Sequence, residues 1–392
     1  MPVRVNPKEV RLQRGECNGV QIHSRFGAFR FLRLQRLNRL LAATWGCNPF
    51  YTRKWRKAGL RPERLGSLDR LAAFPFTTRS ELVSDQAARP PLGTNLSCSL
   101  AEVKQLHRSS GTSLAPLLWG DTWESWQWVI RCSQSLYLLA GLSREDRVFF
   151  SLTLGTSSGP WILYEGAGAL NCVRRTAGQT APQRQLKRVE TFRPNVVVGK
   201  PSQLLALALA AELAGHPPES LGVRKLIFTG EPSRNTLRSQ LERLWAAECF
   251  DRYGLTEAGS VASECTAHNG GMHLLESEFI AEVISPNTGQ PAGEGKLGEL
   301  VLTNLGRLAR PIIRYRTGDL VRLVRDHHCP CGRAEALLLG DVVRAHVQRP
   351  WSGEPGGVLA LGKLEGARSG LCSRSTSFNA SLRTNTVNSC SA

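Results

Sequence analysis

Residues 251–257 read Asp-Arg-Tyr-Gly-Leu-Thr-Glu and place an aromatic ring, a hydroxyl and a carboxylate within one short segment. Residues 314–319 read Arg-Tyr-Arg-Thr-Gly-Asp and offer a second carboxylate after a glycine turn. An aromatic ring can stack on a base, a hydroxyl can bond a phosphate, and carboxylates can bind Mg²⁺ or accept hydrogen bonds from a ribose. Together the two segments indicate a nucleotide site, although Asp319 taken alone is more simply a turn-capping residue.

Two other segments precede them in the chain. Residues 109–113 read Ser-Ser-Gly-Thr-Ser, and their hydroxyls and backbone N–H groups can surround phosphate oxygens. Their spacing differs from that of the lysine-containing loop G-x-x-x-x-G-K-[ST], and a run of Ser, Thr and Gly is more often an ordinary loop. Residues 230–232 read Gly-Glu-Pro. Each segment alone is weak evidence for a nucleotide site. The order of all four segments along the chain is the stronger evidence.

These four segments, taken in their order along the chain, resemble the motifs of the phenylacetate-CoA ligase family of the adenylate-forming superfamily. The similarity covers about residues 34–340 and includes residues 48–51, 74–78 and 192–195. It implies that ATP activates a carboxylic acid, of aryl or arylacetic type, to an acyl-adenylate, and that the acyl group then passes to coenzyme A. It also implies ATP, Mg²⁺ and coenzyme A as cofactors or co-substrates. The sequence does not identify the acid. An aryl pocket could be lined by Trp161, Tyr164, Gly166 and Gly168, but aromatic residues at such spacing more often belong to the core.

The resemblance assigns roles to individual residues. Tyr253 is expected to stack on adenine and Asp319 to bind the ribose hydroxyls. Thr256 is expected to reach the α-phosphate, and Glu257 to bind Mg²⁺, so these two are the expected catalytic residues. The loop at 109–112 is expected to hold the β- and γ-phosphates. Besides Tyr253, Thr256 and Asp319, the residues expected to bind ATP or AMP are Ser109, Ser110, Gly111 and Thr112 of this loop, and Gly230, Glu231, Pro232, Asp251 and Gly254.

A second set of residues has the spacing of a metal site. Two pairs, C-x7-H and C-x-C, consist of Cys265 with His273 and of Cys329 with Cys331. Three thiolates and one imidazole suit a closed, structural Zn²⁺ site. His273 is preferred because its segment Gly-Met-His-Leu matches the family. Metal-free core cysteines are the alternative interpretation, and the competing histidines are His268, His327 and His328.

The hydrophobic pattern predicts an α/β fold. The pattern indicates layered α/β subdomains and a β-rich subdomain, and the resemblance implies that they form the large N-terminal domain of an adenylate-forming enzyme. We expect an irregular extension over 1–33, an adenylation domain over 34–320, a hinge and zinc-loop region over 321–340, and a degenerate or disordered tail over 341–392. The segment 26–45 is expected to be an amphipathic helix with a solvated arginine face. Expected strands cover 148–154, 195–199, 225–229, 278–284, 298–303, 312–315 and 320–324, and expected helices cover 49–57, 203–214 and 235–247.

The chain departs from the family at two places. Leu114 and Ala115 stand where the phosphate loop normally has Gly and then Lys or a polar residue. Residues after 340 do not match the family's small C-terminal domain, and Lys363 lies too early to be its late catalytic lysine. We therefore expect that domain to be mostly missing and adenylation to be slow. The alternative function is a catalytically impaired remnant that binds an adenylate or an acid.

Composition limits the other classes of function. The 392 residues are 41% hydrophobic and 21% charged, as in a folded globular protein. The net charge of +18 comes mainly from residues 1–65, which hold 15 Lys and Arg against 3 acids, so nucleic acid is not an expected partner. The longest apolar run, 204–211, is too short to span a bilayer, so no membrane insertion is expected. The 11 cysteines lack the spacing of a disulfide scaffold and indicate a cytoplasmic protein. A small-molecule carboxylic acid is the expected partner, and a homodimer is left open.

Overall fold

The structure is a computed structural model that describes residues 25–109, 115–232, 235–267 and 270–344. These residues belong to one compact unit, residues 1–346, while the second unit, residues 347–392, lies outside the described part. The predicted degenerate tail therefore falls outside it as well, except for residues 341–344, which belong to a strand. Within the described ranges, no helix combines the length and the apolar composition that crossing a bilayer requires.

Short capped helices form the N-terminal part of this unit. Asn48 begins α2 (Pro49–Lys57), because its side chain accepts a hydrogen bond from the Tyr51 N–H at 3.1 Å. Thr78 and Glu81 form a reciprocal capping box at the start of α3 (Arg79–Ala88). The other N-terminal elements are α1 (Arg25–Thr44), η1 (Leu68–Ala73) and η2 (Leu100–Glu102).

Helix α1 corrects two sequence predictions. It begins at Arg25, so the predicted boundary at residue 33 falls inside a helix. Its arginines do not form one solvated face. Arg33 pairs with Glu276 at 3.3 Å, and Arg36 pairs with Glu278 at 2.5 Å, so both dock the helix onto the segment before β10. Periodicity identifies the residues that share a helix face, but it does not reveal which carboxylates lie opposite.

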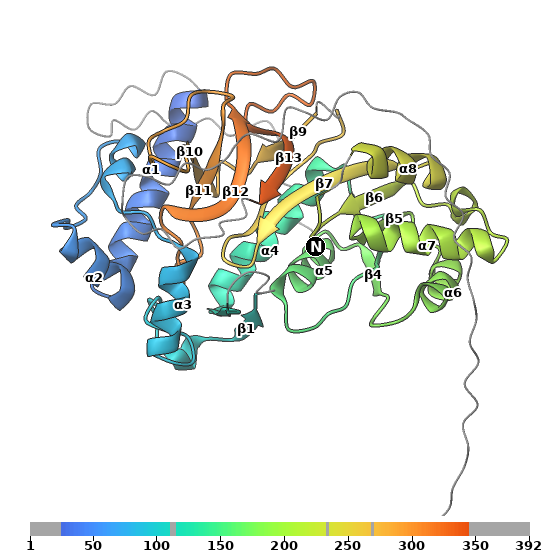
Figure 1. Ribbon diagram of the computed structural model, residues 1–392, viewed down its shortest axis with the longest axis horizontal. Coiled ribbons are helices and arrows are strands. Elements are labelled where there is room, and N and C mark those ends of the chain that lie inside the picture. Colours follow the sequence, from blue (N-terminus) through green and yellow to red (C-terminus); the bar gives the residue numbers. More distant parts are fainter. Residues whose placement is uncertain (1–24, 110–114, 233–234, 268–269, 345–392) are drawn as a thin grey trace, which may run out of the picture. The chain divides into compact units, whose positions relative to one another are not determined.

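The central layer is a sheet whose described strands follow the order β10-β11-β12-β13-β9-β8-β7-β6-β5-β3-β4. Strands β4, β3, β5, β6 and the first half of β7 are parallel, and the rest pair antiparallel. Strand β7 belongs to both parts and runs from one to the other (Figure 1). The expected α/β and β-rich parts thus share one sheet. Its strands are β3 (Arg147–Phe150), β4 (Val173–Thr176), β5 (Val196–Gly199), β6 (Lys225–Phe228), β7 (Glu248–Leu255), β8 (Gly259–Ser263), β9 (Gly271–Leu274), β10 (Phe279–Ile284), β11 (Leu297–Asn304), β12 (Tyr315–Val324) and β13 (Leu337–Arg344).

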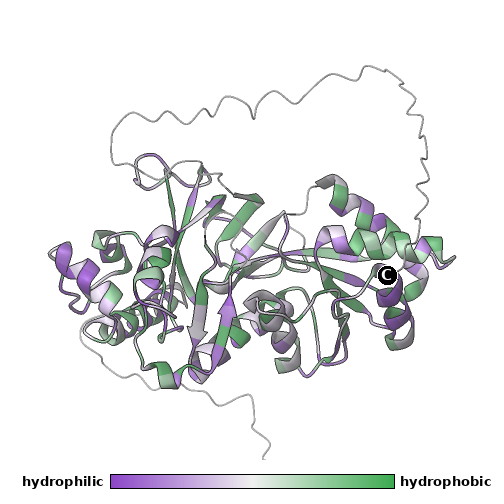
Figure 2. Cartoon of the chain, turned by 60° about the horizontal axis from the view of Figure 1, so that its bottom comes forward, coloured by the Kyte–Doolittle hydropathy of each residue, from purple (hydrophilic) through white to green (hydrophobic). Residues whose placement is uncertain are grey.

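Helices cover both faces of the parallel part. Alternate residues of a strand point to opposite faces, and β3 shows the division. Phe149 packs in one core with residues of α6, α7 and α8, whereas Val148 and Phe150 pack in another core with residues of α4 and α5. Figure 2 shows both hydrophilic and hydrophobic residues along the helices of the chain, and in α6 the buried side chains are Leu186 and Val189. The covering elements are α4 (Trp123–Leu139), α5 (Ser158–Ala169), α6 (Pro182–Phe192), α7 (Pro201–Leu213), η3 (Pro218–Leu221) and α8 (Asn235–Trp245).

The antiparallel part of the sheet differs from the strands predicted for residues 312–324. The expected strands at 312–315 and 320–324 are replaced by one strand, β12, which begins at Tyr315. The predicted boundary at residue 320 therefore falls inside a strand. Strand β13 returns to pair with both β12 and β9, so the predicted hinge region 321–340 is enclosed by strands of the sheet. The division into domains otherwise stays a prediction.

Candidate functional site

A two-stranded hairpin presents the predicted phosphate loop. Strand β1 (Gln105–Arg108) pairs antiparallel with β2 (Leu118–Asp121), and the loop joins their ends. The Ser109 N–H donates to the Leu117 carbonyl at 2.8 Å, and the Leu117 N–H donates to Ser109 Oγ at 2.9 Å. These bonds fix the base of the loop. Residues 110–114 lie outside the described part, so the roles expected of Ser110, Gly111 and Thr112 stay predictions.

Arg79 connects this loop to the predicted Mg²⁺ ligand. Its side chain lies at the first turn of α3, where one Nη atom pairs with the buried carboxylate of Glu257. The other Nη atom donates to Ser109 Oγ at 2.8 Å. Two predicted site residues that lie 148 positions apart in the chain thus face the same guanidinium group. The Glu257 carboxylate is therefore directed at the base of the phosphate loop.

The backbone next to Glu257 is held by a second arginine. Arg307 Nη1 donates to the carbonyl oxygens of Thr256, at 2.8 Å, and Glu257, at 3.0 Å. Its other nitrogens pair with Asp121, the last residue of β2. The turn that carries both expected catalytic residues is therefore attached to the hairpin that carries the phosphate loop.

Tyr253 and Asp319 come together from two distant strands. The Tyr253 hydroxyl donates to Asp319 Oδ2 at 2.7 Å, and Asp319 is buried. A bulge in the β7–β8 pairing lies at Tyr253 and Gly254. Gly254 is needed there, because a Cβ atom would lie 2.5 Å from the Gly259 carbonyl oxygen. The residues expected to contact adenine and ribose therefore lie within one hydrogen bond of each other.

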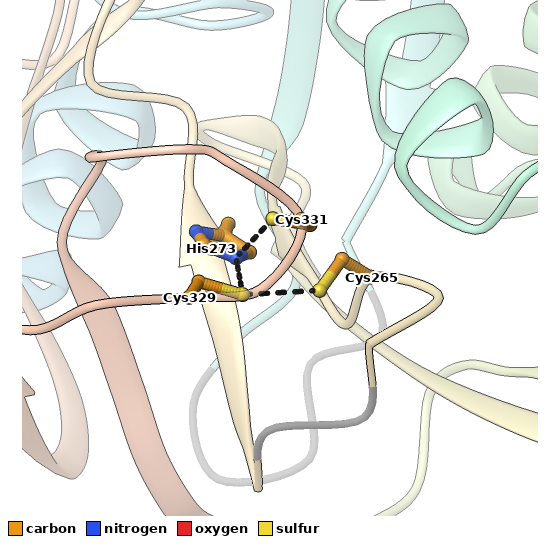
Figure 3. Close-up of side chains that lie close together, drawn as sticks. All are labelled: Cys265, His273, Cys329 and Cys331. Atoms are coloured by element: carbon orange, nitrogen blue, oxygen red, sulfur yellow. Dashed lines mark hydrogen bonds between the residues drawn. The ribbon is translucent and has the colours of Figure 1, made fainter.

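The Cys and His side chains also gather at one place. Their ligand atoms lie within 4.8 Å of one another, and Figure 3 shows His273 between the sulfurs of Cys329 and Cys331. The Sγ atoms of Cys265 and Cys329 are 3.7 Å apart, and His273 Nε2 lies 3.3 Å from both Cys329 Sγ and Cys331 Sγ. A tetrahedral Zn²⁺ with Zn–S of about 2.3 Å and Zn–N of about 2.0 Å would separate two sulfurs by about 3.8 Å and sulfur from nitrogen by about 3.5 Å. The spacing fits that donor set.

The surroundings of His273 favour the tautomer that a metal requires. Burial lowers the pKa of His273, so the ring is neutral at pH 7. Its Nδ1 lies 3.3 Å from the Glu335 carbonyl oxygen, which can only accept. The proton then sits on Nδ1, and the lone pair on Nε2 faces the sulfurs. A backbone carbonyl behind a ligating histidine is a common arrangement in metal sites.

Known proteins resemble this chain over about three quarters of its length. Residues 129–306 match the family model described as AMP-binding enzyme. The phenylacetate-coenzyme A ligase of Pseudomonas putida is 35% identical over 76% of this chain and 67% of its own length. That of Thermus thermophilus is 32% identical over 79% of this chain and 68% of its own length. The chain belongs to the phenylacetate-coenzyme A ligase family.

A solved structure extends the similarity to the fold. A 2-hydroxyisobutyryl-CoA ligase, in complex with 2-HIB-AMP and CoA, matches with a TM-score of 0.75 and 28% sequence identity. The match covers 79% of this chain and 68% of that ligase. The fold class predicted from the sequence, the large α/β domain of an adenylate-forming enzyme, is therefore confirmed.

Two family-predicted segments are held by ion pairs. Asp251 pairs with Arg238 at 3.3 Å, and Glu264 joins the same guanidinium at 2.9 Å, which gives Asp251 a structural role in the strand. Glu231 lies 3.6 Å from Lys200, and Gly230 has a φ of +75° that favours glycine. Pro232 is exposed beside them. The nucleotide contacts expected of these residues stay predictions.

Sequence reasoning missed Arg79 and Arg307. Each is a single arginine far from its partners in the chain, in a chain with 50 Lys and Arg residues. Arg79 lies within the first turn after the segment 74–78, which the resemblance did include, so its position was the available signal. Arg307 carried no such signal, because only the fold brings it to Thr256 and Glu257.

A pocket of about 400 Å³ lies between α4, α5 and β4. Trp161, Tyr164 and Gly168 line it, as three of the four residues considered for an aryl pocket. The fourth, Gly166, lies against Ser133, where a Cβ atom would come within 2.4 Å of the hydroxyl oxygen. Arg174 closes one side, because its guanidinium lies 4.3 Å from the centre of the Tyr164 ring.

Proposed function

We propose that this chain activates a carboxylic acid with ATP and passes the acyl group to coenzyme A. In the first step a carboxylate oxygen attacks the α-phosphorus, and pyrophosphate leaves. In the second step the thiol of coenzyme A attacks the acyl carbon, and AMP leaves. The observation that carries the proposal is the arrangement around Glu257, which faces the base of the phosphate loop through Arg79. Tyr253 lies four positions before Glu257, and its hydroxyl donates a hydrogen bond to Asp319 of the distant strand β12.

We assign the following roles in this reaction to individual residues. Asp319 accepts hydrogen bonds from the ribose, and the Tyr253 ring stacks on adenine. Thr256 contacts the α-phosphate, and Arg79 moves its positive charge from Glu257 to the phosphates when the nucleotide binds. Glu257 is a suitable Mg²⁺ ligand, since its carboxylate already faces a cation and ATP sites hold this metal by one or two carboxylates plus phosphates. Mg²⁺ in such a site neutralises charge on the transferring phosphates.

We propose an aryl or arylacetic acid as the substrate, because the curated relatives are phenylacetate-coenzyme A ligases. The pocket lined by Trp161 and Tyr164 is a candidate place for an aromatic ring, although Gln127, Glu165 and Arg174 also line it. A 2-hydroxyisobutyryl-CoA ligase with the same fold makes a small hydroxy acid the second candidate.

Acid-dependent pyrophosphate release tests the proposal. Phenylacetate, benzoate, 2-hydroxyisobutyrate and a fatty acid are compared at saturating ATP and Mg²⁺, with Glu257→Gln as the matched control. Release above the acid-free rate with an aryl acid, lost in the control, supports the proposal. No acid-dependent release from folded protein that binds ATP would favour the impaired binding remnant instead.

We further propose that Cys265, His273, Cys329 and Cys331 hold a structural Zn²⁺. The support is the donor set, its spacing and the orientation of His273. The metal would join the end of β8, strand β9 and the loop before β13. We also place the protein in the cytoplasm, because the eight described cysteines form no disulfide with one another, which suits a reducing compartment.

A further inference from the structure

We propose that Arg307, held by Asp121, is a positioning residue for the Mg²⁺ ligand Glu257. The inference rests on the proposed function. Arg307 Nε donates to Asp121 Oδ1 at 2.6 Å, and Nη2 donates to Oδ2 at 2.5 Å, a two-point arrangement that fixes the plane of the guanidinium. Both side chains are fully buried. The guanidinium has no freedom to turn away from its remaining partners.

Those remaining partners are the two carbonyl oxygens of the catalytic turn. The third nitrogen, Nη1, bonds the Thr256 and Glu257 carbonyls at 2.8 and 3.0 Å. The ring of Trp119 lies 5.2 Å from the guanidinium carbon and limits movement on one side. Arg307 thus fixes the backbone of Glu257, while Arg79 contacts its carboxylate. Because Arg79 would leave for the phosphates, the backbone contact is the one that persists when the metal binds.

The same pair joins the metal ligand to the phosphate loop. Asp121 ends β2, whose first residue follows directly after Leu117 at the base of the loop. The Asp121 carbonyl also accepts from the Lys104 N–H at 2.8 Å, which fixes it to the hairpin. Glu257 would hold Mg²⁺ beside the phosphates, so a Glu257 backbone that keeps its place relative to this hairpin should favour metal binding. The Arg307–Asp121 pair attaches the Glu257 backbone to that hairpin.

Mg²⁺ titration of nucleotide binding tests the inference. Wild type, Arg307→Lys and Arg310→Lys are compared by the rise in melting temperature at fixed ATP, and ATP affinity is measured separately in EDTA. Arg310 is the matched control, since it is buried, lies 4.5 Å from the same Trp119 ring and donates to the Leu118 carbonyl at 2.8 Å. Residues behind a metal ligand typically change metal affinity by about 10- to 100-fold. Arg307→Lys should therefore raise the Mg²⁺ midpoint about tenfold and leave metal-free ATP affinity within about twofold.

Several results would overturn the inference. An unchanged Mg²⁺ midpoint in Arg307→Lys, or equal increases in Arg307→Lys and Arg310→Lys, contradicts a positioning role. Glu257→Gln adds a second readout, because Arg307→Lys should have no further effect on the midpoint once the metal ligand is gone. If Arg307→Lys does not fold, Asp121→Asn replaces it under the same criterion. A wild type that binds no MgATP contradicts the proposed function as well, whereas normal wild-type binding with an unaffected variant contradicts this inference alone.

Discussion

The hydroxyl of Tyr253 donates a 2.7 Å hydrogen bond to the carboxylate of Asp319, which lies 66 positions further along the chain. Tyr253 lies in the antiparallel half of the crossing strand β7, and Asp319 lies on β12. Substitutions at the two should differ in effect, because a ring that stacks on adenine does not need its hydroxyl. A carboxylate that binds two ribose hydroxyls has no such substitute.

Asp319→Ala should weaken ATP binding about 10- to 100-fold, since a hydrogen bond to a charged group contributes about 1.5–3 kcal/mol. Tyr253→Phe keeps the ring and should weaken it less than about fivefold. Isothermal titration of ATP into both variants measures the difference. Equal losses would show that the hydrogen bond between the two residues, rather than nucleotide contact by Asp319, carries the effect.

Arg79→Met should impair nucleotide binding beyond any loss of stability. The substitution removes the cation from the buried Glu257 carboxylate and from Ser109, so the variant should bind ATP about tenfold more weakly. Arg53→Met is a suitable control, because it also removes an arginine that pairs with a carboxylate, here Asp85 of α3 at 3.2 Å. Comparable ATP affinity in the two variants, measured by the same titration, would exclude a role for Arg79 in phosphate binding.

The order of the four motif segments predicted the fold, and the segment 251–257 led to Tyr253 and Glu257, whose partners in the structure are Asp319 and Arg79. What the sequence did not contain was the identity of partners across space. In the sequence, Arg33 and Arg36 look like solvated helix residues. Only the fold shows that they pair with Glu276 and Glu278. Arg79 resembles any arginine at a helix start until Glu257 is folded against it. Long-range ion pairs of this kind depend on topology, which periodicity and local motifs do not specify.

The metal prediction has a direct chemical test. Metal-replete protein should contain one Zn²⁺ per chain by elemental analysis, and Cys329→Ser should lose it together with thermal stability. A loss of stability is expected, because Zn²⁺ that binds only the folded cluster stabilises the folded state. Cys132→Ser is the matched control, since Cys132 is a buried free thiol outside the cluster. If wild type binds no Zn²⁺ and its melting temperature is the same with and without added Zn²⁺, the four residues are ordinary core side chains.

Stability should depend on pH through His107. This ring is buried on β1, stacks on Trp126 at 4.8 Å, and its Nε2 has no hydrogen-bond partner among the described atoms. Burial lowers the pKa of His107 below its usual value of about 6.5. The unfolded chain therefore binds a proton that the folded chain resists, and stability falls as the pH drops below about 6.5, by at most about 1.4 kcal/mol per pH unit.

His107→Phe keeps an aromatic ring against Trp126 and removes the titration. Denaturant unfolding between pH 7.5 and 5.5 should show a smaller loss of stability in this variant than in wild type. Identical pH dependence in both proteins would mean that His107 titrates normally in the folded state.

The path of the carboxylate oxygen tests the central claim most directly. The chain is incubated with ATP, Mg²⁺, coenzyme A and phenylacetate carrying oxygen-18 in its carboxylate, and the products are analysed by mass spectrometry. If the carboxylate attacks the α-phosphorus and the thiol then displaces AMP, one labelled oxygen must appear in AMP and the other must stay in the thioester. Glu257→Gln should form little of either product. Thioester formed without label in AMP, or label found in pyrophosphate or phosphate instead, would contradict an acyl-adenylate mechanism.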